Sequence, residues 1–358
     1  MSDRQAYIAF NLTDRIGPAK LERLAADAGG SVAAAWEAYP DKVSRTGGKV
    51  DVAAEEEQAK RYGVRIVTPA DEGYPARLMG TPGAPLALYV KGDVAALSKP
   101  MVAIVGTRRA TSYGHAVAHR LAADLAAAGW CVVSGLALGI DADGHRGALD
   151  AKGLTVGVIG SGLDRFYPER NRDLAREIVA KGGAVASQFP FGRPADEQTF
   201  PIRNHVVAAL AQGVVAVECP MKSGTLITTG IAADLGRPVM AVPGPVDSHM
   251  SAGCLDLIRN GATLVRNADD VIEMLSPLSP RNGAKSGEEK PVEPDPERPP
   301  YSVEESLVML HVEDTGTSMD ELVAKTGLSP RKVNSIAMSL RLKGFVRFLP
   351  GNRIAPPR

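Results

Sequence analysis

The sequence predicts an α/β protein built on a doubly wound parallel sheet, with a small helical module before the sheet and a winged-helix domain after it. One observation is a set of short, almost continuously apolar runs, at Met101–Val105, Cys131–Ser134, Thr155–Ile159, Ala184–Ser187, Val214–Glu218 and Val239–Val242. Another is the amphipathic stretches between these runs, such as Tyr113–Ala127 and Asn171–Ala180. Strands that are apolar on both faces and alternate with helices are typical of a sheet covered by crossover helices.

The domain boundaries follow from length and composition. A chain of 358 residues is long for one domain. Residues 276–300 contain seven prolines and almost no large apolar side chain, so this segment cannot bury enough surface to fold. We therefore expect four parts: a helical SAM-like module at 1–65, the α/β domain at 66–277, a proline-rich linker at 278–300 and the winged helix at 301–358.

The helical module contains an apolar-Gly-Pro turn, Ile16-Gly17-Pro18, just before a helical pattern. Such a turn resembles those of helix-hairpin-helix and SAM-like modules, in which the amides of a helix start can hold a phosphate. An ordinary helix-helix turn is the alternative. We treat this module as accessory.

The overall composition restricts the classes of function. The 41 basic and 41 acidic residues cancel, so a nucleic-acid site would have to be a local patch. Cys131, Cys219 and Cys254 are far apart and form no C-x-x-C pair, so no disulfide, metal site or cofactor is expected. The amino terminus has no apolar signal segment, and no apolar run approaches the roughly 20 residues that span a bilayer. We expect a soluble cytoplasmic protein with no membrane partner.

The loop after the first predicted strand has the chemistry of an anion site. Ligands of open α/β sheets bind outside the carboxyl ends of the strands, so these loops are where function should concentrate. Arg108 and Arg109 lie between Gly106 and Ser112, just before a helix. Guanidinium groups and helix-start amides both favour phosphate, although capping beside solvated arginines would produce the same pattern.

The next two loops carry weaker signals. Asp141, Asp143 and His145 could suggest a metal, but capping of the following helix by Asp141 explains them better. The Gly-x-Gly of Gly160–Gly162 hints at a dinucleotide site, yet Arg165 stands where the fingerprint needs its third glycine.

The last two loops combine an aromatic ring, cations and hydroxyl groups. Phe200 lies beside Arg203 and Asn204 where a helix is expected to begin. Proteins that bind single-stranded nucleic acid use an aromatic ring to stack a base and a cation to neutralise a phosphate. Alone, Phe200 could equally be a core residue. The segment Lys222–Thr225 offers a lysine and hydroxyls that could meet a phosphate at the next helix start.

Together and in this order, the loops resemble the family of DNA-processing protein A, also called DprA or Smf. The resemblance spans roughly residues 68–262 and rests on the motifs VGTRRATSYG, SGLALGID, GSGLDRFYPERN, SQFPFG, FPIRN, SGTLITT and VPGPVDSHMSAGCLDLIRNGA. It implies an extended Rossmann-like domain that binds single-stranded DNA, forms a homodimer and assists loading of the RecA recombinase in natural transformation, without being an enzyme.

The resemblance also assigns residues. Arg108 matches the phosphate-contacting arginine of the family, Lys222 lies in a segment that supplies a basic contact, and Arg203 lies in a motif that borders the same pocket. Combined with the loop chemistry, this gives an expected single-stranded-DNA site of Gly106, Arg108, Arg109, Ser112, Gly135, Gly160, Ser161, Gly162, Phe200, Arg203, Asn204, Lys222, Ser223, Gly224 and Thr225. This chain departs from the family at Gln188, usually a glutamate, and at His205, usually an arginine, which bears on affinity more than on function.

The carboxyl-terminal segment fits a winged helix. Ser318 followed by Glu321 has the spacing of a capping box. Residues 329–358 contain seven basic residues and no acidic one, which is compatible with a recognition helix and a basic wing. Contact with another protein is an equally open role. The expected elements are helices at Val303–His311, Ser318–Lys325 and Ser329–Lys343, and a hairpin at Phe345–Ile354.

Other classes of protein fit less well. Pro220–Thr228 aligns with the Pro-Gly-Gly-x-Gly-Thr-x-x-Glu motif of the LOG-like phosphoribohydrolases, but Thr228 occupies the position of the acid and cannot act as a carboxylate. His115 and His119 lack the adjacent glutamate of a zincin, and no P-loop motif occurs. A scaffold without a DNA site would leave the loop cations unexplained.

Overall fold

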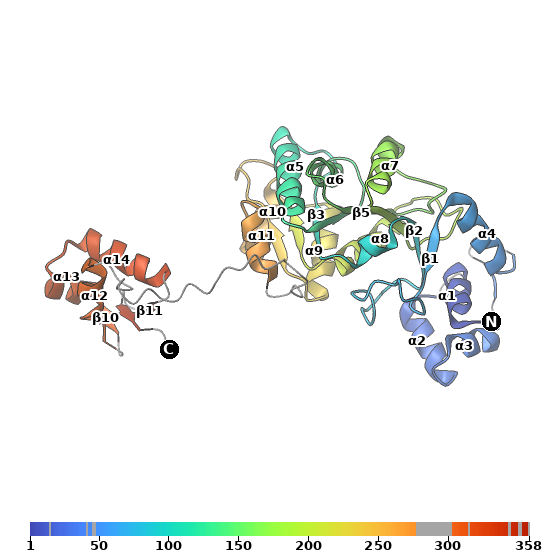
Figure 1. The fold of residues 1–358 in the computed structure, drawn as a ribbon, viewed down its shortest axis with the longest axis horizontal. Coiled ribbons are helices and arrows are strands. Elements are labelled where there is room, and N and C mark those ends of the chain that lie inside the picture. Colours follow the sequence, from blue (N-terminus) through green and yellow to red (C-terminus); the bar gives the residue numbers. More distant parts are fainter. Residues whose placement is uncertain are drawn as a thin grey trace, which may run out of the picture. The chain divides into compact units, whose positions relative to one another are not determined.

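The computed structural model describes residues 1–13, 16–40, 42–44, 48–276, 303–313, 316–342, 345–349 and 353–356 (Figure 1). The chain divides into two compact units, Met1–Pro280 and Arg281–Arg358. The first unit holds both the amino-terminal helices and the α/β sheet. The proline-rich segment 276–300 lies outside the described residues, except for Ser276.

The first unit is organised around a nine-stranded, mostly parallel sheet with the strand order β1-β2-β6-β5-β4-β3-β7-β8-β9. Strands β3 to β8 confirm the doubly wound prediction and pair in parallel, whereas β2 pairs antiparallel with both β1 and β6. The strands are β1 (Arg65–Val67), β2 (Leu88–Gly92), β3 (Met101–Val105), β4 (Cys131–Ser134), β5 (Thr155–Val158), β6 (Ala184–Ser187), β7 (Val214–Ala216), β8 (Val239–Ala241) and β9 (Thr263–Leu264).

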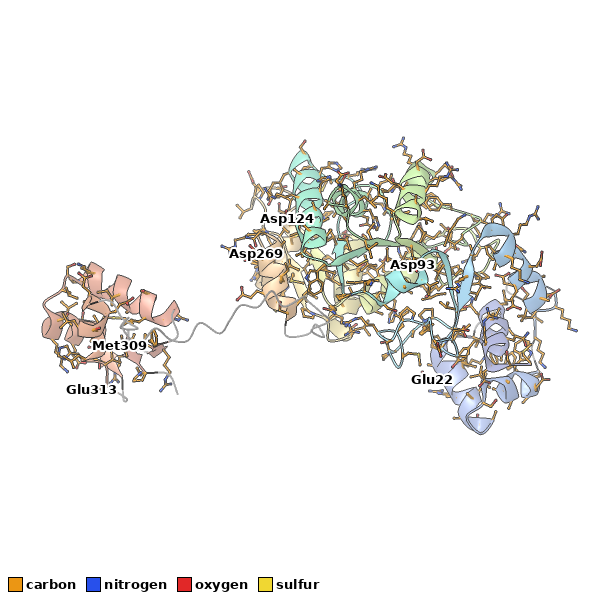
Figure 2. The ribbon with its side chains drawn as sticks, in the orientation of Figure 1. Glu22, Asp93, Asp124, Asp269, Met309 and Glu313 are labelled. Atoms are coloured by element: carbon orange, nitrogen blue, oxygen red, sulfur yellow. The ribbon has the colours of Figure 1, made fainter. Side chains whose placement is uncertain are left out.

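Helices cover both faces of this sheet. Figure 1 shows α5, α6 and α7 on one side and α8 and α9 on the other. Asp124 on α5 and Asp269 on α11 are among the exposed carboxylates of these helices (Figure 2). The helices are α1 (Asp3–Leu12), α2 (Pro18–Asp27), α3 (Val32–Ala38), α4 (Val52–Tyr62), α5 (Ser112–Ala127), α6 (Ile140–Asp150), α7 (Arg172–Ala180), α8 (Thr199–Leu210), α9 (Gly224–Asp234), α10 (Ala252–Arg259) and α11 (Ala268–Leu275), with short 3-10 turns η1 (Val94–Ser98) and η2 (Glu169–Asn171).

The central strand β3 shows why the predicted runs were apolar throughout. Met101, Ala103 and Val105 belong to the core that includes α8 and part of α9. Val102 and Ile104, which alternate with them, belong to the opposite core with α5 and α11. Since successive side chains of a strand point to opposite faces, a sheet covered on both sides needs apolar residues at every position.

His145 braces α6 against the sheet. Its Nδ1 lies 2.6 Å from the hydroxyl of Thr155, and that hydroxyl donates to the carbonyl oxygen of Val132 at 2.7 Å. His145 Nδ1 must therefore carry the proton. Burial lowers the pKa of His145 to about 3. Among the described residues, no three His, Cys, Asp or Glu side chains are grouped so as to hold a metal ion.

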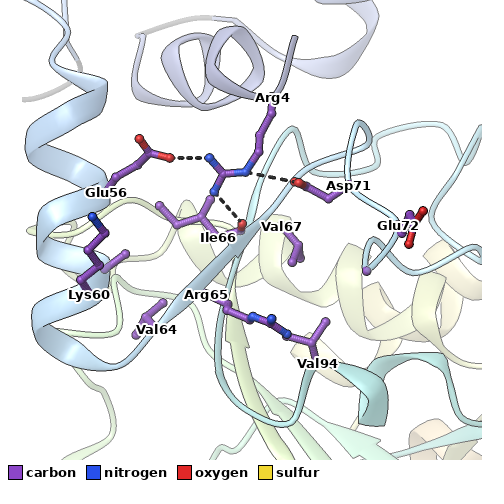
Figure 3. A pocket seen from close by; sticks show the side chains of 12 residues that line it. Arg4, Glu56, Lys60, Val64, Arg65, Ile66, Val67, Asp71, Glu72 and Val94 are labelled. Carbon is purple, nitrogen blue, oxygen red and sulfur yellow. Dashed lines mark hydrogen bonds and ion pairs between the residues drawn. The ribbon is translucent and has the colours of Figure 1, made fainter. Parts of the chain in front are cut away.

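The amino-terminal helices are tied to the sheet by Arg4. Its guanidinium contacts the carboxylate of Glu56 on α4 and lies 3.3 Å from that of Asp71, and it donates to the carbonyl oxygen of Ile66 at 3.2 Å (Figure 3). These contacts border a cavity of about 490 Å³ between α4 and β1. Arg4 thus satisfies a backbone carbonyl oxygen of the edge strand β1, and an edge strand with unpaired backbone groups could otherwise pair with another chain.

The second unit contains the elements of the predicted winged helix. Ser318 and Glu321 form the expected capping box at the start of α13. Strand β10, which was not predicted, pairs with the hairpin in the order β10-β12-β11. The elements are α12 (Val303–Met309), α13 (Met319–Thr326), α14 (Pro330–Leu342), β10 (Thr317–Ser318), β11 (Arg347–Leu349) and β12 (Arg353–Ala355).

Across the described ranges, no helix has the length and apolarity to cross a membrane.

The contact between α5 and α6 yields the first prediction. A Cβ atom added at Gly147 on α6 would clash with the backbone carbonyl oxygen of His119 on α5, whereas one at Gly230 on α9 meets nothing within 4 Å. Gly147→Ala should lower the free energy of unfolding by about 1–3 kcal/mol through overpacking. Gly230→Ala, the control, should raise it by about 0.5–1 kcal/mol through helix propensity. Urea unfolding of both variants measures the two effects; equal effects would contradict this packing.

Candidate nucleic-acid interface

The candidate site lies where the sheet changes its direction of winding, between β3 and β7. From β3 the chain proceeds through α5 to β4 on one side, and from β7 it proceeds through α9 to β8 on the other. Such a switch point leaves a crevice at the carboxyl ends of the strands. A cavity of about 470 Å³ opens there.

Many of the expected residues meet in this cavity. It is lined by the loops after β3, β4 and β7 together with the first turns of α8 and α9. Of the residues expected from sequence, it gathers Gly106, Arg108, Arg109, Gly135, Phe200, Arg203, Asn204, Lys222, Ser223, Gly224 and Thr225. Segments more than a hundred residues apart in the sequence thus form one surface.

Three of the cations lie on the exposed rim. Arg108, Arg109 and Lys222 are solvent-exposed and come from the loops after β3 and β7. The guanidinium carbon of Arg108 lies over the ring of Phe200, 4.9 Å from its centroid. This cation-π contact holds Arg108 at the mouth of the cavity while leaving its donors available.

Arg203, the fourth cation, is buried in the floor. Its side chain donates to the carbonyl oxygen of Gly135 and, at 2.6 Å, to that of Val158. Burial lowers the pKa of Arg203 to about 10, although nearby Asp141 partly offsets this shift. Arg203 therefore joins the loop after β4 to the last residue of β5, and its nitrogens are largely engaged with the protein.

Two carboxylates also line the cavity. Asp141 is buried, which raises its pKa, and it accepts a hydrogen bond from the amide of Ala137 at 3.3 Å. The expectation that Asp141 caps α6 is wrong, because Gly139 is the N-cap residue. Glu197 is exposed at the rim. Among the described residues that line the cavity, the rim carries three cations against one exposed carboxylate, a local positive patch on a chain with no net charge.

Glu218, which the sequence analysis did not single out, controls the start of α5. Its buried carboxylate accepts from the backbone amide of Thr111 at 2.8 Å and from the hydroxyl of Thr111 at 2.6 Å. Thr111 in turn caps α5 by accepting from the amide of Gly114. The anion position expected at this helix start is thus filled by a protein carboxylate.

Several expected residues lie outside the main cavity. Ser112 is exposed on the first turn of α5 and does not line it. Ser161 is fully buried, and the amide of Gly162 donates to the carbonyl oxygen of Arg193 at 2.8 Å. Gly160 borders a small adjoining cavity of about 30 Å³. The Gly160–Gly162 segment therefore packs the loop after β5 rather than facing the crevice.

The small cavity brings in Tyr167, a residue absent from the expected site. Its ring is half-exposed, and its centroid lies 6.1 Å from that of Phe200. Arg108 and Phe200 line both cavities, so the two cavities lie next to each other. The sequence signal that could have indicated Tyr167 is the presence of an aromatic residue in the loop that follows a predicted parallel strand.

The comparisons with known proteins identify the family of this chain. Residues 65–276 match the family DNA recombination-mediator protein A, and residues 292–352 match the DprA winged helix domain. Protein Smf of Synechocystis is 30% identical over 98% of both chains. The structure of DNA processing protein A from Streptococcus pneumoniae superposes with a TM-score of 0.62 and 29% identity, covering 77% of this chain and 98% of that one. The Helicobacter pylori protein, described as showing a single-stranded-DNA binding mode, has a TM-score of 0.54 and 28% identity and covers 60% and 98%.

The contrast between buried and exposed arginines gives the second prediction. Arg203→Met removes the donor of two buried carbonyl oxygens, and each carbonyl left unsatisfied should cost about 1–3 kcal/mol of unfolding free energy. Arg109→Met, the control, changes an exposed cation on the same rim and should stay within about 0.5 kcal/mol of the wild type. Thermal unfolding compares the two variants. A wild-type melting temperature for Arg203→Met would refute the bracing role.

Proposed function

Because this chain belongs to the DNA recombination-mediator protein A family, we propose that it binds single-stranded DNA along the crevice between β3 and β7. The observation that carries the proposal is the convergence of Arg108, Arg109 and Lys222 from two loops onto one rim, beside the aromatic ring of Phe200. Cations neutralise phosphates and rings pack against bases, and neither contact reads a sequence. Binding should therefore be sequence-independent.

A single strand fits this site better than a duplex. The cations lie at the mouth of a concave cavity, next to the apolar edge of Phe200, and a single strand can turn its bases toward that edge while its phosphates contact the rim. The bases of a duplex are stacked and paired inside, so only its backbone could approach. The rim would then gain the electrostatic contact without the stacking.

The protein acts, in this proposal, by binding and not by catalysis. The rival phosphoribohydrolase reading needs an acid at the position of Thr228. The hydroxyl of Thr228 instead donates to the carbonyl oxygen of Gly224 at 3.3 Å, within α9. A hydroxyl engaged in this way supplies neither a general base nor a stabilising negative charge at neutral pH.

The family resemblance also supports a finer role, in which the protein protects incoming single strands and assists loading of RecA recombinase during natural transformation. The test is whether this protein speeds the ATP hydrolysis of RecA on a strand already covered by single-strand-binding protein. No acceleration would remove RecA loading from the proposal and would leave DNA binding intact.

The third prediction separates local from global charge. Arg108→Ala with Lys222→Ala should weaken binding of a dT oligonucleotide and flatten the slope of log affinity against log salt by roughly 0.7 for each lost phosphate contact. The control, Arg176→Ala on α7 with Lys181→Ala at its C-cap, removes the same charge from an exposed surface and should change neither quantity. Fluorescence anisotropy at several salt concentrations measures both quantities, with a duplex of equal length as reference.

The outcome that sinks the proposal is a folded Arg108→Ala, Lys222→Ala protein with wild-type affinity and wild-type salt slope. Equal loss in the α7 control would also count against it, because binding would then follow total charge. The basic segment at 329–358 would become the leading candidate for the DNA site.

The fourth prediction concerns assembly. We propose a symmetric homodimer through the α/β domain, as the family resemblance implies. Within the part of the chain that the structure describes, the last strand of the sheet, β9, pairs only with β8, and Leu264 on this strand is 44% exposed. An apolar side chain on an open sheet edge is suited to a self-complementary contact. Light scattering at micromolar concentration should give twice the chain mass, and Leu264→Arg should give the monomer mass. A monomeric wild type contradicts the proposal.

A further inference from the structure

The ring of Phe200 is already engaged by two neighbours. The guanidinium of Arg108 lies over it at 4.9 Å, and the ring of Tyr167 packs against it at a centroid distance of 6.1 Å and an angle of 44°. A base inserted between two rings needs about 3.5 Å on each side, or roughly 7 Å in all. The Tyr167–Phe200 pair is closer than this, so it offers no slot for a base in this arrangement.

Tyr167 has the more accessible ring of the two. Its relative exposure is 50%, whereas Phe200 is partly buried. Tyr167 lies in the loop after β5, and Phe200 supports it from α8. A Cβ atom at Gly160 would come within 3.2 Å of the Phe200 ring, so the glycine there allows Phe200 to lie close under the loop. Tyr167 therefore has an exposed ring that packs against Phe200.

The position of Tyr167 continues the line of cations along the sheet. Lys222 follows β7, Arg108 follows β3 and Tyr167 follows β5, and these strands occur in the order β5-β4-β3-β7. Three strand spacings of about 4.8 Å separate the two ends, or roughly 14 Å. A DNA single strand that runs across the carboxyl ends from β7 to β5 would contact the cations Lys222 and Arg108 and then the exposed ring of Tyr167.

We propose that Tyr167 forms a base subsite of its own, in which one nucleobase of the bound single strand stacks on the outer face of the ring. The stacking contact that the proposed function places beside Phe200 is thereby assigned to Tyr167, and Phe200 acts mainly by supporting Arg108 and Tyr167. This inference rests on the proposed function, because it places one base of the same DNA strand. It assigns the stacking role to a residue that the expected DNA site did not include.

The chain contains a matched control for this proposal. Tyr62 at the end of α4 is 43% exposed and stacks on Phe191 with centroids 5.4 Å apart. It is therefore a half-exposed tyrosine supported by a phenylalanine, as Tyr167 is. Tyr62 does not line the cavity that holds Arg108 and Lys222. A general effect of losing a surface ring would appear equally at both positions.

The experiment compares Tyr167→Leu, Tyr167→Phe and Tyr62→Leu in the full chain, with a fluorescent dT oligonucleotide at several salt concentrations. Tyr167→Leu should weaken binding roughly 5- to 150-fold, the range for one lost stack, with an unchanged salt slope. Tyr167→Phe keeps the ring and should bind as the wild type does, as should Tyr62→Leu. Irradiation of a strand that carries 5-bromodeoxyuridine should cross-link Tyr167, located by mass spectrometry of the peptides.

The failures of the two proposals are distinguishable. If Tyr167→Leu binds like the wild type, or if its salt slope flattens, Tyr167 does not stack a base, and the proposed function stands as long as the Arg108 and Lys222 variants lose affinity. Cross-links only at peptides other than that of Tyr167 also overturn the subsite. If the wild-type protein does not bind the oligonucleotide, it is the proposed function that fails.

Discussion

The structure depends on the reversal of winding between β3 and β7. The helix after β3 covers one face of the sheet and the helix after β7 covers the other, so the two loops diverge and leave the crevice between them. A backbone hydrogen bond of 2.8 Å from Thr107 to the carbonyl oxygen of Glu218 ties these loops at their base. The Glu218 carboxylate then fixes the start of α5 at Thr111. The cavity is thus a consequence of topology, locked by a few long-range contacts.

The site contains buried charged residues, which hold its loops in place, and exposed cations, which are accessible to a ligand. Arg203 and Asp141 are buried and interact electrostatically, and burial lowers the pKa of Arg203 to about 10 and raises the pKa of Asp141. The rim cations Arg108, Arg109 and Lys222 remain exposed and free to meet a phosphate. Because exposed charges interact over a distance set by salt, binding at this rim should be strongly salt-dependent. The buried residues Arg203 and Asp141 make the site more rigid beneath the exposed cations.

Much of this fold could be predicted from the sequence, for a physical reason. Central strands such as β3 are covered on both faces, so their continuous apolarity is visible without any structure. The edge strands β1 and β9 were missed because they have only three and two residues and are partly exposed. The convergence of Arg108 and Lys222 could be expected because both residues lie in loops at the carboxyl ends of predicted parallel strands. The role of Glu218 did not, because its partner lies 107 residues away, and neither did the burial of Arg203.

The most direct measurement is a structure of the full chain bound to a dT oligonucleotide. We predict phosphate groups within hydrogen-bonding distance of the side chains of Arg108 and Lys222, with the strand following the carboxyl ends of β7, β3 and β5. An oligonucleotide bound only to the winged helix, with the crevice between β3 and β7 empty, would contradict DNA binding at this crevice.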